Sequence, residues 1–173
     1  MLRPGASLMT QVYICQGDQA VGRDPEMAVA TILGSCISIC LWDPVAGVGG
    51  MNHLLLPALR SEGNALSTGA VDMDRLINRM MPLGAERPRL RAKLFGGASM
   101  LSGRTDIGAR NVEFGRAYLG NEGIPCDAEN TGGNRARHVR YWPATGKAQL
   151  RFVAEAPELE GQRIIVRNDV ELF

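Results

Sequence analysis

The alternation of apolar and other positions is clearest at residues 36–42. Branched apolar residues occupy every second position there, a period of two that is typical of a β-strand. Residues 43–47, with the sequence Asp-Pro-Val-Ala-Gly, have the residue types of a turn. Residues 48–56 predict a second strand, which Pro57 ends. The pattern therefore predicts a β-hairpin.

The rest of the chain predicts short strands and two helices. A helix is predicted at residues 69–81, where an apolar stripe with helical spacing is expected in the core and consists of Met73, Leu76, Ile77, Met80 and Met81. A second helix, capped by Asp106, is predicted to run to about Leu119. Together these elements predict an α+β sandwich. An apolar run at residues 27–33 leads into the segment before Cys36. Further strands are expected at residues 10–15, 124–129, 138–142, 147–153 and 162–167, with loops at 17–25 and 59–68.

Composition narrows the class of protein. A length of 173 residues suits a single domain spanning residues 1–173. The net charge of +1 and the aromatic content of 5% argue against nucleic-acid binding, which needs a concentrated basic face with stacking aromatics. The first residues lack the apolar core of a signal peptide, and no apolar run reaches the ~20 residues that span a bilayer. We therefore expect a cytoplasmic protein that does not insert into a membrane.

The cysteines occupy positions 15, 36, 40 and 126, and in the cytoplasm they are expected to be reduced. No Cys-x-x-Cys or His-x-x-x-His spacing occurs, so neither a metal nor another cofactor is expected. Cys15, Cys40 and Cys126 are predicted to be core residues, because free cysteine is among the most buried residue types.

The predicted hairpin brings Cys36 and His53 to the same face. With a two-residue loop at 44–45, paired residue numbers sum to 89 and Cys36 faces His53 directly. With a four-residue loop at 44–47 they sum to 91, and the two residues are diagonal neighbours with Cβ atoms about 7–8 Å apart. In both registers a thiol lies near an imidazole, the pairing of nucleophile and base in cysteine hydrolases and transferases.

Residues around this pair favour catalysis over simple packing. Gly34 and Ser35 precede Cys36, so the backbone there can turn tightly and present N–H groups to an oxyanion. Residues 49–50, both glycine, lie opposite and are expected to leave room for a substrate chain. His53 is one of only two histidines and interrupts an apolar segment.

These residues resemble the CheD family, the chemoreceptor glutamine deamidases of bacterial and archaeal chemotaxis. The resemblance rests on Thr-Ile-Leu-Gly-Ser-Cys, which ends at Cys36, and on Trp-Asp-Pro-Val-Ala-Gly-Val-Gly-Gly-Met-Asn-His, which ends at His53. Leu-Leu-Pro follows at once. Three later segments resemble the family in the same order and at similar spacings, namely residues 93–100, 107–112 and 127–137.

The resemblance implies a role for each site residue and an architecture. The catalytic cysteine of the family corresponds to Cys36 and its histidine to His53, and Thr31 is the candidate for a catalytic threonine shortly before the cysteine. The implied fold is a single CheD-like domain, a layered α/β sandwich with mixed β-sheets, similar to bacterial toxins that deamidate host glutamines.

The implied reaction is hydrolysis of a glutamine side-chain amide on the cytoplasmic helices of methyl-accepting chemotaxis receptors. Cys36 attacks the amide carbon, ammonia leaves with a proton from His53, and water hydrolyses the thioester to leave glutamate. An adjacent imidazolium is expected to lower the pKa of the Cys36 thiol, and Thr31 to hold the His53 tautomer.

Two alternatives stay open at this level. An amine could replace water at the thioester, which would make the protein a transglutaminase. The family also includes regulatory binding partners of CheC-type phosphatases, and this chain could act chiefly as such a partner.

Overall fold

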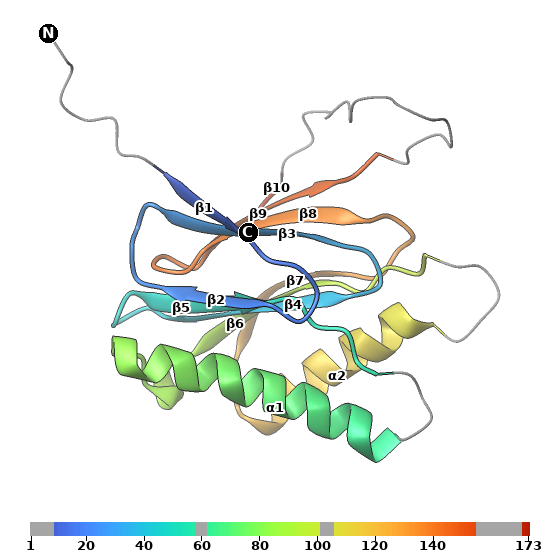
Figure 1. The fold of residues 1–173 in the computed structure, drawn as a ribbon, viewed down its shortest axis with the longest axis horizontal. Coiled ribbons are helices and arrows are strands. Elements are labelled where there is room, and N and C mark those ends of the chain that lie inside the picture. The colour runs from blue at the N-terminus through green and yellow to red at the C-terminus, as the bar shows by residue number, and fades with distance from the viewer. Residues whose placement is uncertain (1–8, 58–61, 101–105, 155–170) are drawn as a thin grey trace, which may run out of the picture.

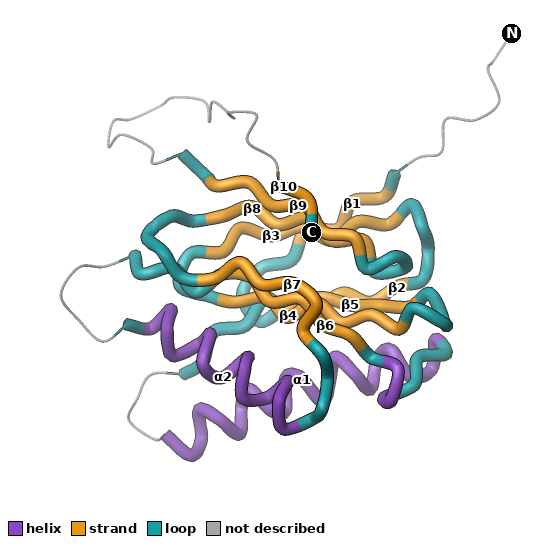
Figure 2. The backbone as a smooth tube through the Cα atoms, turned by 180° about the vertical axis from the view of Figure 1, so that it is seen from behind, coloured by secondary structure: helices purple, strands orange, loops and turns teal. Residues whose placement is uncertain are grey.

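The computed structural model describes residues 9–57, 62–100, 106–154 and 171–173. Two five-stranded sheets stack face to face, and two α-helices cover the outer face of the second sheet (Figure 1). The same three layers are seen from behind in Figure 2. Both sheets contain parallel and antiparallel pairs, which confirms the predicted α+β class and the layered sandwich with mixed sheets.

The first sheet has the strand order β1-β3-β8-β9-β10. Only its edge pair β1–β3 is parallel, and the other pairs are antiparallel. The β8–β9 hairpin confirms the strands predicted on either side of residues 143–146. The strand bounds are β1 (Thr10–Tyr13), β3 (Met27–Leu33), β8 (Arg137–Trp142), β9 (Lys147–Phe152) and β10 (Glu171–Leu172).

The second sheet has the strand order β2-β5-β4-β6-β7, and here β6–β7 is the parallel pair. The hairpin predicted from the alternation is β4–β5, at the centre of this sheet. The strand bounds are β2 (Gln19–Gly22), β4 (Ile37–Asp43), β5 (Val48–Asn52), β6 (Arg91–Gly96) and β7 (Cys126–Thr131).

Strand β4 contributes to two hydrophobic cores, which explains its alternation. Ile37, Ile39 and Leu41 are fully buried in the cluster between the second sheet and the helices. Cys40 lies in the other cluster, between the two sheets. Burying one such branched side chain stabilises the fold by about 1.5–3 kcal/mol, so a one-residue slip of this strand would be strongly unfavourable.

The helices are α1 (Glu62–Met80) and α2 (Ile107–Asn121). The apolar stripe of α1 packs in the helix-side core as predicted up to Met80, but Met81 lies past the end of the helix and is exposed. The cap of α2 is also confirmed, because the Asp106 carboxylate accepts a hydrogen bond of 2.9 Å from the N–H of Ala109. Short 3₁₀ turns at Met81–Leu83 and Arg87–Arg89 lead from α1 to β6.

Several sequence predictions are corrected. Helix α1 begins at Glu62, inside the predicted loop 59–68. The sequence missed this start because the first part of the helix is polar and has no apolar stripe, and Leu66 is exposed. Strand β2 lies inside the predicted loop 17–25 and is held by pairing with β5. Strand β5 stops at Asn52, after which Leu54 makes a single bridge to Ile37. The strand predicted at 162–167 lies outside the described residues.

Cys15 and Cys126 are exposed, whereas Cys40 is buried as predicted. Cys15 follows edge strand β1 and Cys126 begins edge strand β7, so neither has a sheet neighbour on one side. Within the described part of the chain, neither helix is long and apolar enough to cross a membrane.

Candidate active site

The register of the β4–β5 hairpin places Cys36 and His53 diagonally on one face. Asp43 pairs with Val48 next to the loop and Ile37 with Leu54 at the far end, so paired numbers sum to 91 at both ends of the hairpin. This is the register of the four-residue loop. In a regular ladder, diagonal neighbours of this register have Cβ atoms about 7–8 Å apart.

The turn explains why this register is chosen. The Asp43 carboxylate accepts hydrogen bonds from the N–H groups of Val45 and Ala46, at 2.9 and 3.0 Å. The N–H of Gly47 donates to the Asp43 carbonyl at 2.9 Å, and Gly47 has a φ of 63°, a conformation that favours glycine. Asp43 thus holds the loop closed at four residues.

Thr31 and His53 meet across the space between the two sheets. Thr31 lies on β3 of the first sheet, and His53 follows β5 of the second. The Thr31 hydroxyl lies 2.7 Å from His53 Nδ1, and both side chains are buried. The same hydroxyl donates its proton to the carbonyl of Ile14 at 2.7 Å. Because a hydroxyl has one proton, Thr31 must accept from Nδ1–H, which leaves His53 Nε2 as the free base.

The backbone around His53 is also fixed. Its carbonyl accepts from the N–H of Gly17 at 2.9 Å, and its own N–H donates to the carbonyl of Asp18 at 3.1 Å. Burial lowers the pKa of His53, while the negative charge of Asp18 and the Ile14 carbonyl oppose that shift. The net effect is a His53 pKa below the ordinary histidine value, which favours the neutral imidazole.

Cys36 is half-buried at the edge of the inter-sheet core. Burial raises the pKa of its thiol, and a hydrogen bond from its own backbone N–H partly opposes this. The expected lowering of the thiol pKa by an imidazolium is not found, because burial is the largest influence on the Cys36 pKa and raises it; this favours a neutral thiol at rest. A neutral thiol paired with a neutral imidazole works by general-base removal of the S–H proton during attack.

The turn before and including Cys36 is held by its carbonyl groups. The carbonyl of Gly34 accepts from the N–H of Ala98 at 2.9 Å, and that of Cys36 from the N–H of Gly97 at 2.8 Å. The carbonyl of Ser35 accepts from the side-chain amide of Asn111 at 2.8 Å. Gly34 and Ser35 are half-buried, adjacent to Cys36 as predicted.

Residues 49–50 do not leave room for a substrate. A Cβ atom on Gly49 would lie 2.3 Å from the carbonyl oxygen of Pro143, and one on Gly50 would lie 2.8 Å from the Val21 side chain. These glycines allow β5 to pack tightly against its neighbours. Their role lies in the core and not in substrate access.

Ile14 and Asp18 contribute to the candidate site although the sequence did not point to them, and Asn111 lies in the 107–112 segment that resembles the family but was given no role there. Ile14 acts through its carbonyl, which any residue would supply. A polar residue on the buried side of a helix is a weak indication of a special role, and Asn111 is such a residue on α2, next to Val112. Among the described residues no group of three or more His, Cys, Asp and Glu side chains could hold a metal ion.

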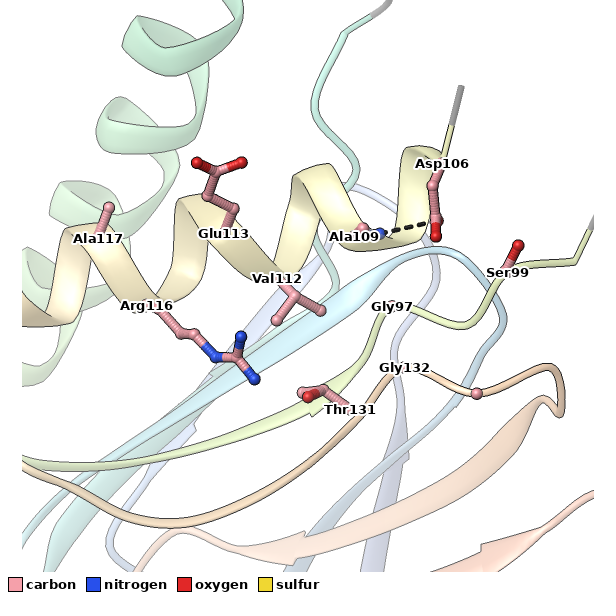
Figure 3. Close-up of a pocket in the computed structure, with 11 residues that line it drawn as sticks. Gly97, Ser99, Asp106, Ala109, Val112, Glu113, Arg116, Ala117, Thr131 and Gly132 are labelled. Carbon is pink, nitrogen blue, oxygen red and sulfur yellow. Dashed lines mark hydrogen bonds between the residues drawn. The ribbon is translucent and has the colours of Figure 1, made fainter. Parts of the chain in front are cut away.

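A hollow of about 600 Å³ lies between α2 and the ends of β6 and β7 (Figure 3). Arg116 on α2 and Thr131 on β7 line its opposite sides, and the loop containing Gly97 and Ser99 forms one end. Its described lining does not include Cys36, Thr31 or His53. The hollow therefore borders the loop that hydrogen-bonds the Gly34–Cys36 turn, and not the Cys36 thiol itself.

The chain matches the family model described as CheD chemotactic sensory transduction over residues 55–152, a segment that begins after His53. A "probable chemoreceptor glutamine deamidase CheD" of Caulobacter vibrioides is 42% identical over 94% of this chain and 93% of its own length. Proteins of the same name from Cereibacter sphaeroides and Acidiphilium cryptum are 49% and 45% identical. They cover 99% and 86% of this chain, and 83% and 82% of their own lengths. The chain therefore belongs to the CheD family.

Proposed function

We propose that this protein is a chemoreceptor glutamine deamidase, a protein-glutamine glutaminase that converts receptor glutamine side chains to glutamate and releases ammonia. The observation that carries the proposal is the hydrogen bond from His53 Nδ1–H to Thr31, which leaves Nε2 as a base on the face shared with Cys36. The names of relatives at 42% and 49% identity support the substrate class.

In the first half-reaction, His53 Nε2 removes the proton of the Cys36 thiol while the sulfur attacks the amide carbon. The carbonyl π-electrons move to oxygen, and the Cys36 N–H is the proposed donor to that oxyanion. When the tetrahedral intermediate collapses, the C–N bond breaks and Nε2–H gives its proton to the leaving nitrogen. Ammonia departs and a thioester with Cys36 remains.

In the second half-reaction, His53 Nε2 takes a proton from water, and the resulting hydroxide attacks the thioester carbon. The C–S bond then breaks and Nε2–H returns the proton to the sulfur. The balance is one glutamine and one water converted to one glutamate and one ammonia, with Cys36 and His53 regenerated.

A threonine as the third residue of the proposed triad, after Cys36 and His53, fits this reaction cycle. Thr31 carries no charge, so it orients His53 without stabilising an imidazolium at rest. The lowered pKa of His53 is consistent with this, because a neutral imidazole is the form that accepts the thiol proton. Asp18 supplies limited charge compensation when the imidazolium forms transiently.

The proposed substrates are the cytoplasmic helices of methyl-accepting chemotaxis receptors, and the proposed location is the cytoplasm. We treat residues 1–173 as one CheD-like domain with this activity. Because Cys36 is half-buried, a glutamine side chain on the surface of a receptor helix can approach the thiol without entering a deep cavity.

The test is intact-mass analysis of a purified receptor cytoplasmic fragment incubated with the protein, together with an ammonia assay. We expect the mass gain of replacing amide NH₂ by OH, and release of ammonia. Cys36→Ala should abolish both, whereas Cys126→Ser, which changes an exposed thiol on another strand, should not. Deamidation that survives in Cys36→Ala would contradict the proposed nucleophile.

The same variant separates the alternative of a regulatory partner. If binding to a CheC-type phosphatase carries the biology, Cys36→Ala should bind that phosphatase and support chemotaxis like the unaltered protein. Loss of chemotaxis with retained binding would assign the biological role to the deamidase reaction.

A further inference from the structure

Asn111 joins the segment before Cys36 to the segment after His53. It lies on α2, is fully buried, and uses both ends of its side-chain amide. Its Nδ2 donates to the Ser35 carbonyl at 2.8 Å, and its Oδ1 accepts from the N–H of Leu56 at 3.1 Å. A single side chain thus tethers both halves of the proposed catalytic pair.

The bond to Ser35 determines the orientation of one peptide group. The Ser35 carbonyl and the Cys36 N–H belong to the same planar peptide and point in opposite directions. Because Asn111 holds the carbonyl toward α2, the Cys36 N–H points away from α2. The Cys36 amide also opposes the rise in the pKa of its own thiol, so this N–H lies near the sulfur.

Close packing keeps Asn111 within reach of this peptide. A Cβ atom on Gly108 would lie 2.4 Å from the carbonyl oxygens of both Gly97 and Ala98, so the start of α2 contacts their loop directly. The same loop donates to the carbonyls on either side of Ser35. Helix α2 and this loop therefore support the turn as one rigid unit.

We propose that Asn111 is a positioning residue that orients the Ser35–Cys36 peptide so that the Cys36 N–H can donate to the oxyanion of the tetrahedral intermediates. This inference rests on the proposed deamidase function. Only a side chain with both a donor and an acceptor at this length can hold Ser35 and Leu56 together, which explains an asparagine in an apolar core.

Two variants separate the two bonds of Asn111. Asn111→Asp keeps an acceptor for the Leu56 N–H but replaces the donor to Ser35 with an oxygen that repels its carbonyl. Asn111→Leu has similar size and removes both bonds. Tyr141→Phe is the matched control, because it removes one buried hydrogen bond, from the Tyr141 hydroxyl to the Leu41 carbonyl at 2.9 Å, away from the turn.

Two readouts test positioning. Removal of an oxyanion donor lowers kcat by about 10²–10³-fold, so kcat for receptor deamidation should fall about 10²-fold in both Asn111 variants, with KM within about twofold. Alkylation of Cys36 by iodoacetamide, measured in a Cys15→Ser, Cys126→Ser background, should slow several-fold at a fixed pH, because the N–H no longer stabilises the thiolate. Tyr141→Phe should leave both values unchanged.

A merely structural role gives a different pattern. If Asn111→Asp retains kcat and alkylation rate within about twofold of Tyr141→Phe at matched thermal stability, the proposal is overturned. The alkylation profile needs no receptor, so it tests the positioning of the peptide even if the unaltered protein deamidates no receptor. An absence of receptor deamidation by the unaltered protein would reject the proposed function, and alkylation would still measure the role of Asn111 at the thiol.

Discussion

Thr31 Oγ1 and His53 Nδ1 lie 2.7 Å apart, and this contact joins the two sheets of the molecule. Thr31 belongs to the first sheet and His53 to the second, so the orientation of the imidazole depends on how the sheets pack. The Ile14 carbonyl accepts the Thr31 proton and thereby determines which His53 nitrogen is free.

Thr31→Val should lower kcat by about 10²-fold, because valine has the same shape but cannot accept the Nδ1 proton, so the imidazole loses its orientation. Thr31→Ser should keep most of the activity. Nitrogen NMR of His53 should show one Nδ1–H tautomer in the unaltered protein and a mixture in Thr31→Val. Equal kcat for the serine and valine variants would contradict the orienting role.

The neutral thiol–imidazole pair predicts the pH dependence of Cys36 alkylation. Burial raises the pKa of Cys36, so alkylation should rise only above the ordinary thiol value of about 8.5. The measurement is the rate of iodoacetamide reaction at Cys36, followed by peptide mass analysis from pH 5 to pH 10. Rapid alkylation already near pH 5 would indicate a thiolate–imidazolium pair instead.

In the pH profile of kcat/KM, the apparent pKa of the acid limb should lie below the ordinary histidine pKa of about 6.5. Burial lowers the pKa of His53, so the base stays neutral through neutral pH and activity is lost only as pH falls through that lowered pKa. Asp18→Asn should move the limb to still lower pH, because the Asp18 charge raises the pKa of His53. A limb that does not move would show that Asp18 does not act on His53.

Asp43→Asn should reduce the free energy of unfolding at neutral pH. Burial disfavours the charged Asp43, but hydrogen bonds from Arg89 and from the N–H groups of Ala46, Glu86 and Val45 outweigh this and lower its pKa to about 2. Since the folded pKa lies below the unfolded value, the stabilisation exists above about pH 4 and is lost as pH falls toward 2, with a size of about 2 kcal/mol.

Urea unfolding of the unaltered protein and of Asp43→Asn at several pH values measures this contribution of Asp43. The difference between the two proteins should shrink on acidification. A difference that is independent of pH would show that the carboxylate charge does not stabilise the hairpin turn.

Gly49→Ala should destabilise the protein by about 1–3 kcal/mol or more, because its Cβ would overlap the Pro143 carbonyl oxygen. Gly120→Ala is the control. Gly120 lies in α2 with no atom within 4 Å of an added Cβ, so alanine there should stabilise the helix by about 0.5–1 kcal/mol. Thermal unfolding measures both, and equal stabilities would contradict the packing role of Gly49.

The sequence predicted those parts of the fold that local patterns specify. Alternation defined β4, because side chains of a strand point to opposite faces in strict order, and the turn residues defined where the hairpin turns but not the length of its loop. The cap of α2 at Asp106 was predictable for the same local reason. By contrast, the polar start of α1 and the short strand β2 have no periodic signal, since tertiary contacts hold them.

The sequence by itself determined that Cys36 and His53 share a face, because a hairpin loop of two or of four residues gives that result. The structure decided between the two registers: the Asp43 carboxylate accepts from loop N–H groups, and Arg89 and the Glu86 N–H, which are distant in the chain, hold that carboxylate in place. It also decided the contact of Thr31 with His53 and that of Asn111 with Ser35. Those contacts join residues distant in the chain, and their geometry follows from the packing of sheets and helix, which no local pattern encodes.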